Sequence, residues 1–322
     1  MTEVKGTGMD LETILTRAVA EKATDIHLQS GRPPYIRVGA ELQPLALPHI
    51  QTADLQAWSK ETGPGEAWSF SWKEGIRCRG QRSESRHGPH WALRVLYPLS
   101  SLPQEENPVL IQRLGTLLQG LVLVCGATGS GKTTTIWRVL EYINQHRACH
   151  IVTLEDPVEY ILEGKKALFT QREVGGHVDS FEEGVRQALR QDPDIMLIGE
   201  IRDKHTLQNA ITAAETGVLV FSTLHSPSVA GAVSRMVGMF AAGEQEEIRQ
   251  RLAAVLASVV AQQCFRDKNR MHIVRELLWR TPAAAQVIRS GKEFHLTDVM
   301  QTGGEYGMET MAQALKRYRS GI

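Results

Sequence analysis

The stretch from Gly126 to Thr134 carries the residues of this sequence that are best suited to chemistry. It reads GATGSGKTT, the spacing of a phosphate-binding P-loop. Its glycines let the backbone curl so that N–H groups point at a phosphate. Lys132 is placed to reach the β- and γ-phosphates of a nucleoside triphosphate, and the Thr133 hydroxyl is placed to hold Mg²⁺. The predicted nucleotide-binding residues are Gly126, Ala127, Thr128, Gly129, Ser130, Gly131, Lys132, Thr133 and Thr134.

The segments on either side of this loop suit that role. An apolar run from Leu121 to Cys125 precedes the loop and predicts a buried strand, and a helix is expected over Ile136 to Ile143. A buried strand, a glycine-rich turn and a helix N-terminus form the setting in which P-loops bind phosphate. An accidental glycine-rich turn is the alternative, but it would need neither the lysine nor the hydroxyls.

Two acidic residues follow predicted strands further along the chain. Glu155 comes directly after a strand that ends at Leu154, so its carboxylate can face the γ-phosphate and polarise a water molecule. The same acid could instead cap the element that follows. Glu200 ends the strand within LRQDPDIMLIGEIRD, where Gly199 leaves room for the longer side chain. Its carboxylate is expected to act on Mg²⁺ through bound water.

A fourth strand closes on the polar residues STLHS, which span Ser222 to Ser226. Thr223 or His225 could sense whether the γ-phosphate is present and pass that signal to a neighbouring element. A buried, hydrogen-bonded core histidine is the competing interpretation of His225.

These residues require a particular fold to bring them together. Beyond a polar, proline-bracketed linker at 99–108, predicted strands alternate with helical patterns such as 182–190 and 206–216. This alternation predicts an α/β domain over 109–322, with a largely parallel sheet covered by helices on both faces. Ligands of such sheets sit at the carboxyl ends of the strands. The strands are expected at Leu121–Cys125, His150–Leu154, Ile195–Ile198 and Val218–Ser222.

Residues 1–98 are predicted to form a smaller α+β domain. An amphipathic helix is expected from Leu11 to Glu21, followed by strands at 25–28 and 35–38. A strand-rich stretch then carries five arginines, which form either a solvated basic face or a group that reaches a phosphate on a neighbouring subunit. They are Arg77, Arg79, Arg82, Arg86 and Arg94.

Composition narrows the functional classes. The 36 basic residues balance the 36 acidic residues, which argues against a chain-wide grip on nucleic acid. No apolar run approaches the length of a membrane span, so any membrane association is expected to come through a protein partner. The four cysteines are scattered, which fits reduced thiols in the cytoplasm.

Four motifs give the chain a resemblance to the secretion-ATPase superfamily, which drives type II secretion and type IV pili. They are GATGSGKTTT, TLEDPVEY, LRQDPDIMLIGEIRD and STLHS. Within the superfamily the chain looks most like the type IV pilus retraction ATPases, the twitching-motility motors. The stretches 23–28 and 33–38 resemble that family's opening domain, and the lack of a paired C-x-x-C element favours this branch over the assembly motors.

The resemblance implies a RecA-like P-loop ATPase core with a PAS-like N-terminal domain, arranged as a homo-hexamer that binds ATP and Mg²⁺. Lys132 would grip the phosphates, and Thr133 with Glu200 would place the metal. Glu155 would be the general base and His225 the γ-phosphate sensor. Arginines of the N-terminal domain complete the ATP site in this family, and Arg77 with Arg94 best match those positions.

The implied function is a motor that promotes pilin depolymerisation. It would be cytoplasmic and peripheral at the inner membrane, bound to a platform protein and, as a further partner, a paralogous motor ATPase; no nucleic acid is expected. The alternatives are an assembly or secretion ATPase and a low-turnover regulatory paralogue. Three departures from the family pattern bear on the choice: Val218 where histidine is usual, Ala284–Arg289 in place of an A-I-R-N-L-I motif, and Arg79 where asparagine is common.

Overall fold

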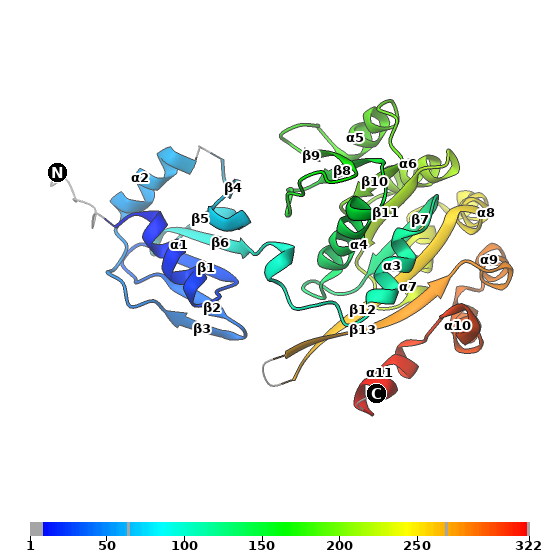
Figure 1. Cartoon of the computed structure of the whole chain (residues 1–322). Helices are drawn as coiled ribbons and strands as arrows, with labels where there is room; N and C mark the ends of the chain where they lie inside the picture. The colour runs from blue at the N-terminus through cyan, green and yellow to red at the C-terminus, as the bar shows by residue number, and fades with distance from the viewer. Residues whose placement is uncertain (1–8, 63–64, 268–269, 321–322) are drawn as a thin grey trace. The chain divides into compact units, whose positions relative to one another are not determined.

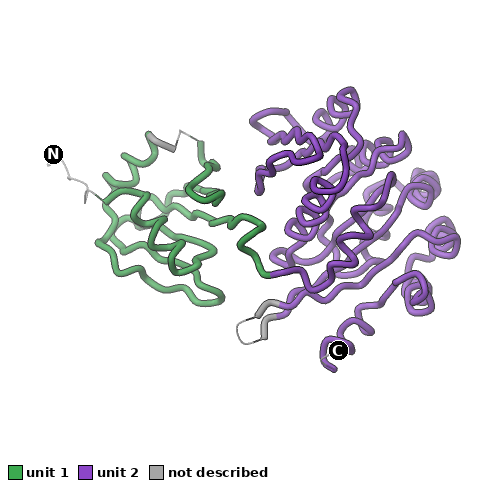
Figure 2. Tube along the Cα trace, in the orientation of Figure 1, with its two compact units in different colours: residues 1–103 green, residues 104–322 purple. Residues whose placement is uncertain are grey.

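The computed structural model describes residues 9–62, 65–267 and 270–320. The chain divides into two compact units, residues 1–103 and 104–322, which Figure 2 draws in different colours. The division between Pro103 and Gln104 falls within the polar segment 99–108. Each unit has its own sheet.

Unit 1 is an antiparallel sheet with two helices (Figure 1). Its six strands lie in the order β3-β2-β1-β6-β5-β4, so the unit's first and last strands, β1 and β6, pair at the centre of the sheet and β3 and β4 form its edges. The α+β character predicted for this part of the chain is confirmed. The strands are β1 (Asp25–Gln29), β2 (Tyr35–Val38), β3 (Glu41–Pro44), β4 (Ala67–Ser71), β5 (Arg77–Ser85) and β6 (Gly88–Leu96); the helices are α1 (Leu11–Ala20) and α2 (Thr52–Thr62).

Hydrophobic periodicity explains how these elements pack. In α1, Leu11, Ile14, Leu15 and Ala18 lie on one buried face, and the Asp10 side chain caps the helix by accepting from the backbone N–H of Thr13 at 2.7 Å. In β1, Ile26 and Leu28 are buried, whereas the residue between them points to the opposite face of the sheet. The core of unit 1 therefore lies between one face of the sheet and its helices.

Unit 2 is built on a seven-stranded sheet in the order β13-β12-β7-β11-β10-β8-β9. Neighbouring strands are parallel except for the antiparallel β12–β13 hairpin, which Figure 1 shows at one edge. The parallel α/β core predicted from the sequence is confirmed. The strands are β7 (Gly120–Cys125), β8 (His150–Glu155), β9 (Leu168–Glu173), β10 (Ile195–Ile198), β11 (Leu219–Leu224), β12 (Leu256–Asp267) and β13 (Arg270–Trp279).

The helices of unit 2 pack in two groups. Helices α3 and α4 contact each other, while α5, α6, α8 and α9 form a continuous series of neighbours. Both α4 and α6 contact β7 and β11, as expected for a sheet covered on both faces. The helices are α3 (Pro108–Gly115), α4 (Lys132–His146), α5 (Phe181–Ala188), α6 (Lys204–Glu215), α7 (Val229–Gly238), α8 (Gln245–Val255), α9 (Pro282–Arg289), α10 (Leu296–Thr302) and α11 (Met311–Arg319).

The structure extends the sequence-based description in three places. Strand β11 begins at Leu219 and continues to Leu224, so it includes Thr223, which had been expected beyond the strand. Helix α4 begins at Lys132, four residues before the predicted start. Strands β9, β12 and β13 were not predicted, and β12 pairs directly with the P-loop strand β7.

In the described parts of the chain, every helix is too short or too polar to cross a bilayer.

Candidate nucleotide-binding and hydrolysis site

The P-loop joins the buried strand β7 to the first residue of α4. All six residues of β7 are buried, so the loop leaves the sheet at a fixed point. Gly131 caps α4 with φ at 82°, a left-handed conformation that favours glycine. At Gly126 an added Cβ would lie 2.4 Å from the carbonyl oxygen of Gln262, so no larger residue fits there. The loop conformation is thus set by close backbone packing against β12.

The Lys132 side chain folds under the loop. Its Nζ donates to the carbonyl oxygens of Gly126 at 3.0 Å and Ala127 at 2.9 Å. Burial lowers the pKa of Lys132, while the carboxylates of Glu200 and Glu159 act in the opposite direction. The ammonium group is therefore held at the loop and lies within electrostatic range of two carboxylates.

The loop fits a bound phosphate. The Ser130 hydroxyl is buried and has no hydrogen-bond partner among the residues that the structure describes, so its oxygen is available to a ligand. The first backbone N–H groups of α4 are oriented as in other helix N-termini that bind anions. Lys132 adds a fixed positive charge. These are the groups that a triphosphate requires.

Mg²⁺ also suits the donor set. The Thr133 hydroxyl and the Glu200 carboxylate are hard oxygen donors, which Mg²⁺ prefers along with water and phosphate oxygens. Across residues 9–62, 65–267 and 270–320, the structure has no group of three His, Cys, Asp or Glu side chains able to hold a metal alone. A metal here would thus be held by Thr133, Glu200 and the nucleotide, and it would supply charge neutralisation at the phosphates.

Glu200 lies in a cluster of charged side chains at the end of β10. It forms an ion pair with Arg202, whose guanidinium also lies 3.5 Å from the carboxylate of Asp156. His225 Nε2 lies 3.7 Å from Glu200 Oε2. Arg202 thus links two acidic motifs that are distant in sequence. Arg202 was not among the predicted site residues, although it stands only two residues after Glu200 in the same motif.

His225 follows β11, the strand next to β7. Its side chain is 46% exposed, so the alternative of a buried core histidine does not describe it. Burial and the positive charge of Lys132 lower the pKa of His225, although the carboxylate of Glu200 acts in the opposite direction. The lowered pKa favours a neutral imidazole at pH 7. The hydroxyl proton of the neighbouring Thr223 is not available to a phosphate, because it is donated to the Gly199 carbonyl at 2.7 Å. Of the two candidate sensors, His225 is the accessible one.

Glu155 ends β8, which is separated from β7 by β11 and β10. Three strand spacings place the two strands about 14 Å apart. Its carboxyl is only 4% exposed and accepts from the Thr153 hydroxyl at 2.7 Å and the Glu159 backbone N–H at 3.3 Å. Burial raises the pKa of Glu155 to about 7, near the value that suits a general base at neutral pH.

Glu159 was not predicted as a site residue, but its carboxylate acts on the pKa of Lys132. The backbone N–H of Glu159 donates to the Glu155 carboxylate. The buried Glu155 therefore orients the loop that carries the half-buried Glu159. Glu155 and Glu159 are therefore both candidates for the general base. The EDPVE motif contained both carboxylates, and only tertiary structure distinguishes them.

Arg77 and Arg94 belong to unit 1. Arg77 Nη2 donates to the Ser69 hydroxyl at 3.0 Å, and Arg94 Nε lies 3.1 Å from Asp25 Oδ1 with its side chain 61% exposed. Strand register places Arg79 directly opposite Arg94 on β5 and β6. Arg82 is engaged differently, with its guanidinium 4.3 Å from the Trp68 ring and 4.9 Å from the Trp91 ring.

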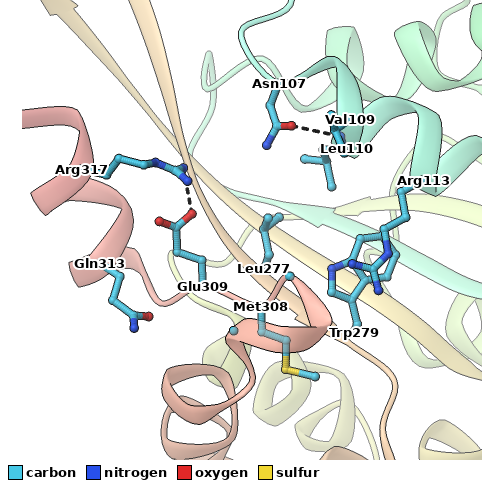
Figure 3. A pocket seen from close by; sticks show the side chains of 12 residues that line it. Asn107, Val109, Leu110, Arg113, Leu277, Trp279, Met308, Glu309, Gln313 and Arg317 are labelled. Atoms are coloured by element: carbon cyan, nitrogen blue, oxygen red, sulfur yellow. Dashed lines mark hydrogen bonds and ion pairs between the residues drawn. The ribbon is translucent and has the colours of Figure 1, made fainter. Parts of the chain in front are cut away.

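A groove of unit 2 lies away from these residues. It encloses about 400 Å³ between α3, β13 and the segment before α11 (Figure 3). Arg113 stacks on Trp279 at 3.8 Å and donates to the Tyr306 carbonyl, and Glu309 pairs with Arg317 at 2.8 Å. None of the predicted site residues lines it. The groove marks where the C-terminal segment is held against the β12–β13 hairpin.

The fold and site together define a P-loop ATPase with a RecA-like core and an antiparallel N-terminal unit. The chain belongs to the type II/IV secretion system protein family, whose pattern matches residues 91–310. It is 37% identical to the type IV pilus retraction ATPase PilT of Pseudomonas aeruginosa, over 96% of this chain and 93% of PilT. It is also 40% identical to the uncharacterized protein YggR of Escherichia coli K12, over 95% of this chain and 97% of YggR.

A solved structure agrees with these relationships. The crystal structure of the pilus retraction motor PilT with bound ADP superposes with a TM-score of 0.85 at 32% sequence identity. The match covers 97% of this chain and 94% of that one. The resemblance seen in the sequence motifs is confirmed at the level of the family and its ATPase fold.

The raised pKa of Glu155 predicts a pH-dependent stability. An unfolded glutamate loses its proton above about pH 4.5, whereas the folded carboxyl keeps its proton until about pH 7. The free energy of unfolding should therefore fall as pH rises across this window, by roughly 3 kcal/mol at most. Glu155→Gln should remove this dependence in urea unfolding at pH 5 and pH 7.5. The exposed Glu163→Gln is the control, and equal pH dependence in wild type and Glu155→Gln would contradict the prediction.

Proposed function

We propose that this protein is an ATP-hydrolysing motor, assembled as a homo-hexamer, that powers retraction of a type IV pilus. The observation that carries the proposal is the near end-to-end correspondence with PilT in both sequence and fold. Similarity limited to the ATPase core would support only ATP hydrolysis. Because the match also includes the N-terminal unit, it supports the same use of ATP hydrolysis as in PilT.

In the proposed reaction, Lys132 and the P-loop N–H groups bind the β- and γ-phosphates of ATP. Thr133 and Glu200 hold Mg²⁺. A carboxylate of the EDPVE motif, Glu155 or Glu159, takes a proton from the attacking water. His225, neutral and close to Glu200, reports whether the γ-phosphate is present.

Arg77 and Arg94 complete the site from the N-terminal unit of a neighbouring subunit in this proposal. Their support is chemical, since guanidinium groups bind phosphate oxygens bidentately. The exposed position of Arg94 and its place opposite Arg79 give unit 1 a basic row on one face of its sheet. This arrangement would make turnover depend on assembly of the ring.

The proposal places the ring in the cytoplasm, peripheral at the inner membrane. It would bind there to a platform protein of the pilus machine, with a paralogous motor ATPase as a further partner. Nucleic acid is not a proposed partner, because the charges of the chain balance.

A second candidate is an assembly or secretion ATPase, or a low-turnover regulatory paralogue. The observation that favours it is the altered segment Ala284–Arg289, which forms most of α9. Its buried residues Ala284, Ala285 and Ile288 keep the helix packed, and Gln286 changes the exposed face of the helix. A changed exposed face would alter coupling to partners and leave ATP chemistry intact.

Piliation of a deletion strain separates these functions. Loss of a retraction motor should leave more or longer pili and abolish twitching, because extension continues unopposed. Loss of an assembly motor should leave no pili. Complementation with Lys132→Ala, which cannot bind phosphate normally, tests whether ATP turnover is required. Wild-type piliation and motility in the deletion strain would refute the retraction proposal.

The general base can be assigned by kinetics. Replacing the base with glutamine should lower kcat by about 10²–10⁴-fold while ADP binding persists. Glu155→Gln and Glu159→Gln are the paired variants, and Glu163→Gln is the exposed control on the same segment. If Glu155 is the base, wild-type kcat should also rise with pH through about 7. Near-normal kcat in both variants would exclude the motif as the source of the base.

The contribution of the arginines is testable with the assembled ring. Arg77→Ala and Arg94→Ala should each reduce kcat, toward the 10³–10⁵-fold range of an arginine finger. Arg86→Ala, an exposed arginine in a turn of unit 1, serves as the control. Because the proposal places these arginines in the site of a neighbouring subunit, mixing either variant with the inactive Lys132→Ala protein should give more activity than either protein has alone. A monomeric preparation with full turnover would contradict the assembly-dependent mechanism.

A further inference from the structure

A glutamine on the long hairpin holds the P-loop from behind. Gln262 of β12 is buried, and its Nε2 donates to the Ser130 carbonyl at 2.5 Å. Its Oε1 accepts from the Thr135 hydroxyl at 3.0 Å. Thr135 lies in the first turn of α4 and is also buried. One side chain therefore ties the phosphate-binding loop to the helix that follows it.

An arginine continues this chain of contacts. Arg275 of β13 lies opposite Gln262 in the β12–β13 register and is 4% exposed. Its Nη2 donates to the Thr135 hydroxyl at 3.2 Å. Its guanidinium also forms a bidentate pair with Glu105, with distances of 2.6 and 3.1 Å. Such fork-to-fork pairs fix orientation as well as charge.

Glu105 ends the chain of contacts next to the boundary between the two units. It is the second residue of unit 2, and it also accepts from Arg138 Nη1 of α4 at 3.1 Å. Burial alone would raise the pKa of its carboxyl, but the hydrogen bonds and charges of Arg275 and Arg138 outweigh burial and lower it. The carboxylate is therefore ionised at neutral pH.

The directions of these hydrogen bonds are consistent from end to end. A threonine hydroxyl has one proton. Because Arg275 donates to the Thr135 oxygen, the Thr135 proton is directed to Gln262 Oε1. The amide of Gln262 is then oriented so that its NH₂ faces the Ser130 carbonyl. Without the arginine, the hydroxyl and amide would lose this fixed orientation.

We propose that Glu105, Arg275, Thr135 and Gln262 form a positioning relay through which the segment joining the two units sets the P-loop for nucleotide binding. The relay acts on the Ser130 carbonyl and touches no phosphate, so its members are positioning residues. Displacement of Glu105 from Arg275 releases the loop, and nucleotide in the loop in turn favours the anchored segment, since coupling is reciprocal. The proposal rests on the ATPase activity of the family and is independent of the retraction role.

Glu105→Gln in the full-length, assembled protein is the central test. The glutamine keeps the shape of the side chain and removes the charge that fixes Arg275. The KM for ATP and the Kd for ADP should each rise on the order of tenfold, within the hundredfold that a displaced site can cost. Glu106→Gln is the matched control, because this adjacent, half-exposed carboxylate pairs with His272 at 2.9 Å and lies outside the relay.

Thr135 provides a second pair of variants. Thr135→Val removes the hydroxyl at nearly constant shape and should reproduce the loss of affinity, while Thr135→Ser retains the hydroxyl and should restore most of it. In a relay the two losses share one cause, so the double variant Glu105→Gln with Thr135→Val should bind ADP about as weakly as either single variant. Hydrogen exchange of the amides in 126–135 should be faster in both single variants.

The outcomes separate positioning from simple stabilisation. If Glu105→Gln lowers the unfolding temperature but leaves ADP affinity and P-loop exchange unchanged, the residue is only structural and the proposal is overturned. Losses that add fully in the double variant would overturn the relay as well. If Glu105→Gln does not fold, the Thr135→Val and Thr135→Ser comparison gives the same decision. None of these readouts depends on piliation, so failure here is distinguishable from failure of the retraction proposal.

Discussion

A lysine charge that is almost wholly buried must be offset by oxygen atoms held close to it, because an isolated buried charge is very costly. Here that charge is the ammonium of Lys132, which two P-loop carbonyls accept and two carboxylates influence. The two carbonyls stay close to the ammonium only if the P-loop has a fixed shape. That shape depends on the junction between β7 and α4 and on β12, which packs behind the loop. The same fixed, desolvated charge is what a triphosphate needs.

Strand order then decides how the other groups approach this charge. From β7, the sheet places the ends of β11, β10 and β8 at one, two and three spacings, carrying His225, Glu200 and Glu155. The most distant acid cannot approach Lys132 by sheet geometry alone. The loop after β8 brings a second carboxylate closer: Glu155 accepts a hydrogen bond from the Glu159 backbone, and the Glu159 carboxylate interacts electrostatically with Lys132. The buried Glu155 thus helps to position Glu159.

Sequence reasoning predicted those parts of the site that depend on local pattern. The P-loop, Glu200 and His225 each follow directly from a strand and a short motif, because parallel strands present their carboxyl ends at one edge. Gln262, Arg275 and Glu105 could not be predicted in this way. Their contacts join residues more than 100 positions apart, and β12 was not recognised as the strand beside β7. Arg77 and Arg94 lie in unit 1, and no local pattern near them encodes a contact with the P-loop of unit 2.

Energetics argue that the Glu105–Arg275 pair has a role other than stability. Buried ion pairs contribute little or nothing relative to well-packed apolar residues, because desolvation offsets their attraction. What a bidentate pair does provide is direction: Glu105 holds the Arg275 guanidinium, and hydrogen bonds then run from Arg275 through Thr135 and Gln262 to the Ser130 carbonyl. The segment that Glu105 anchors is also the covalent connection between the two units. The contacts that orient the P-loop therefore begin where the chain enters unit 2.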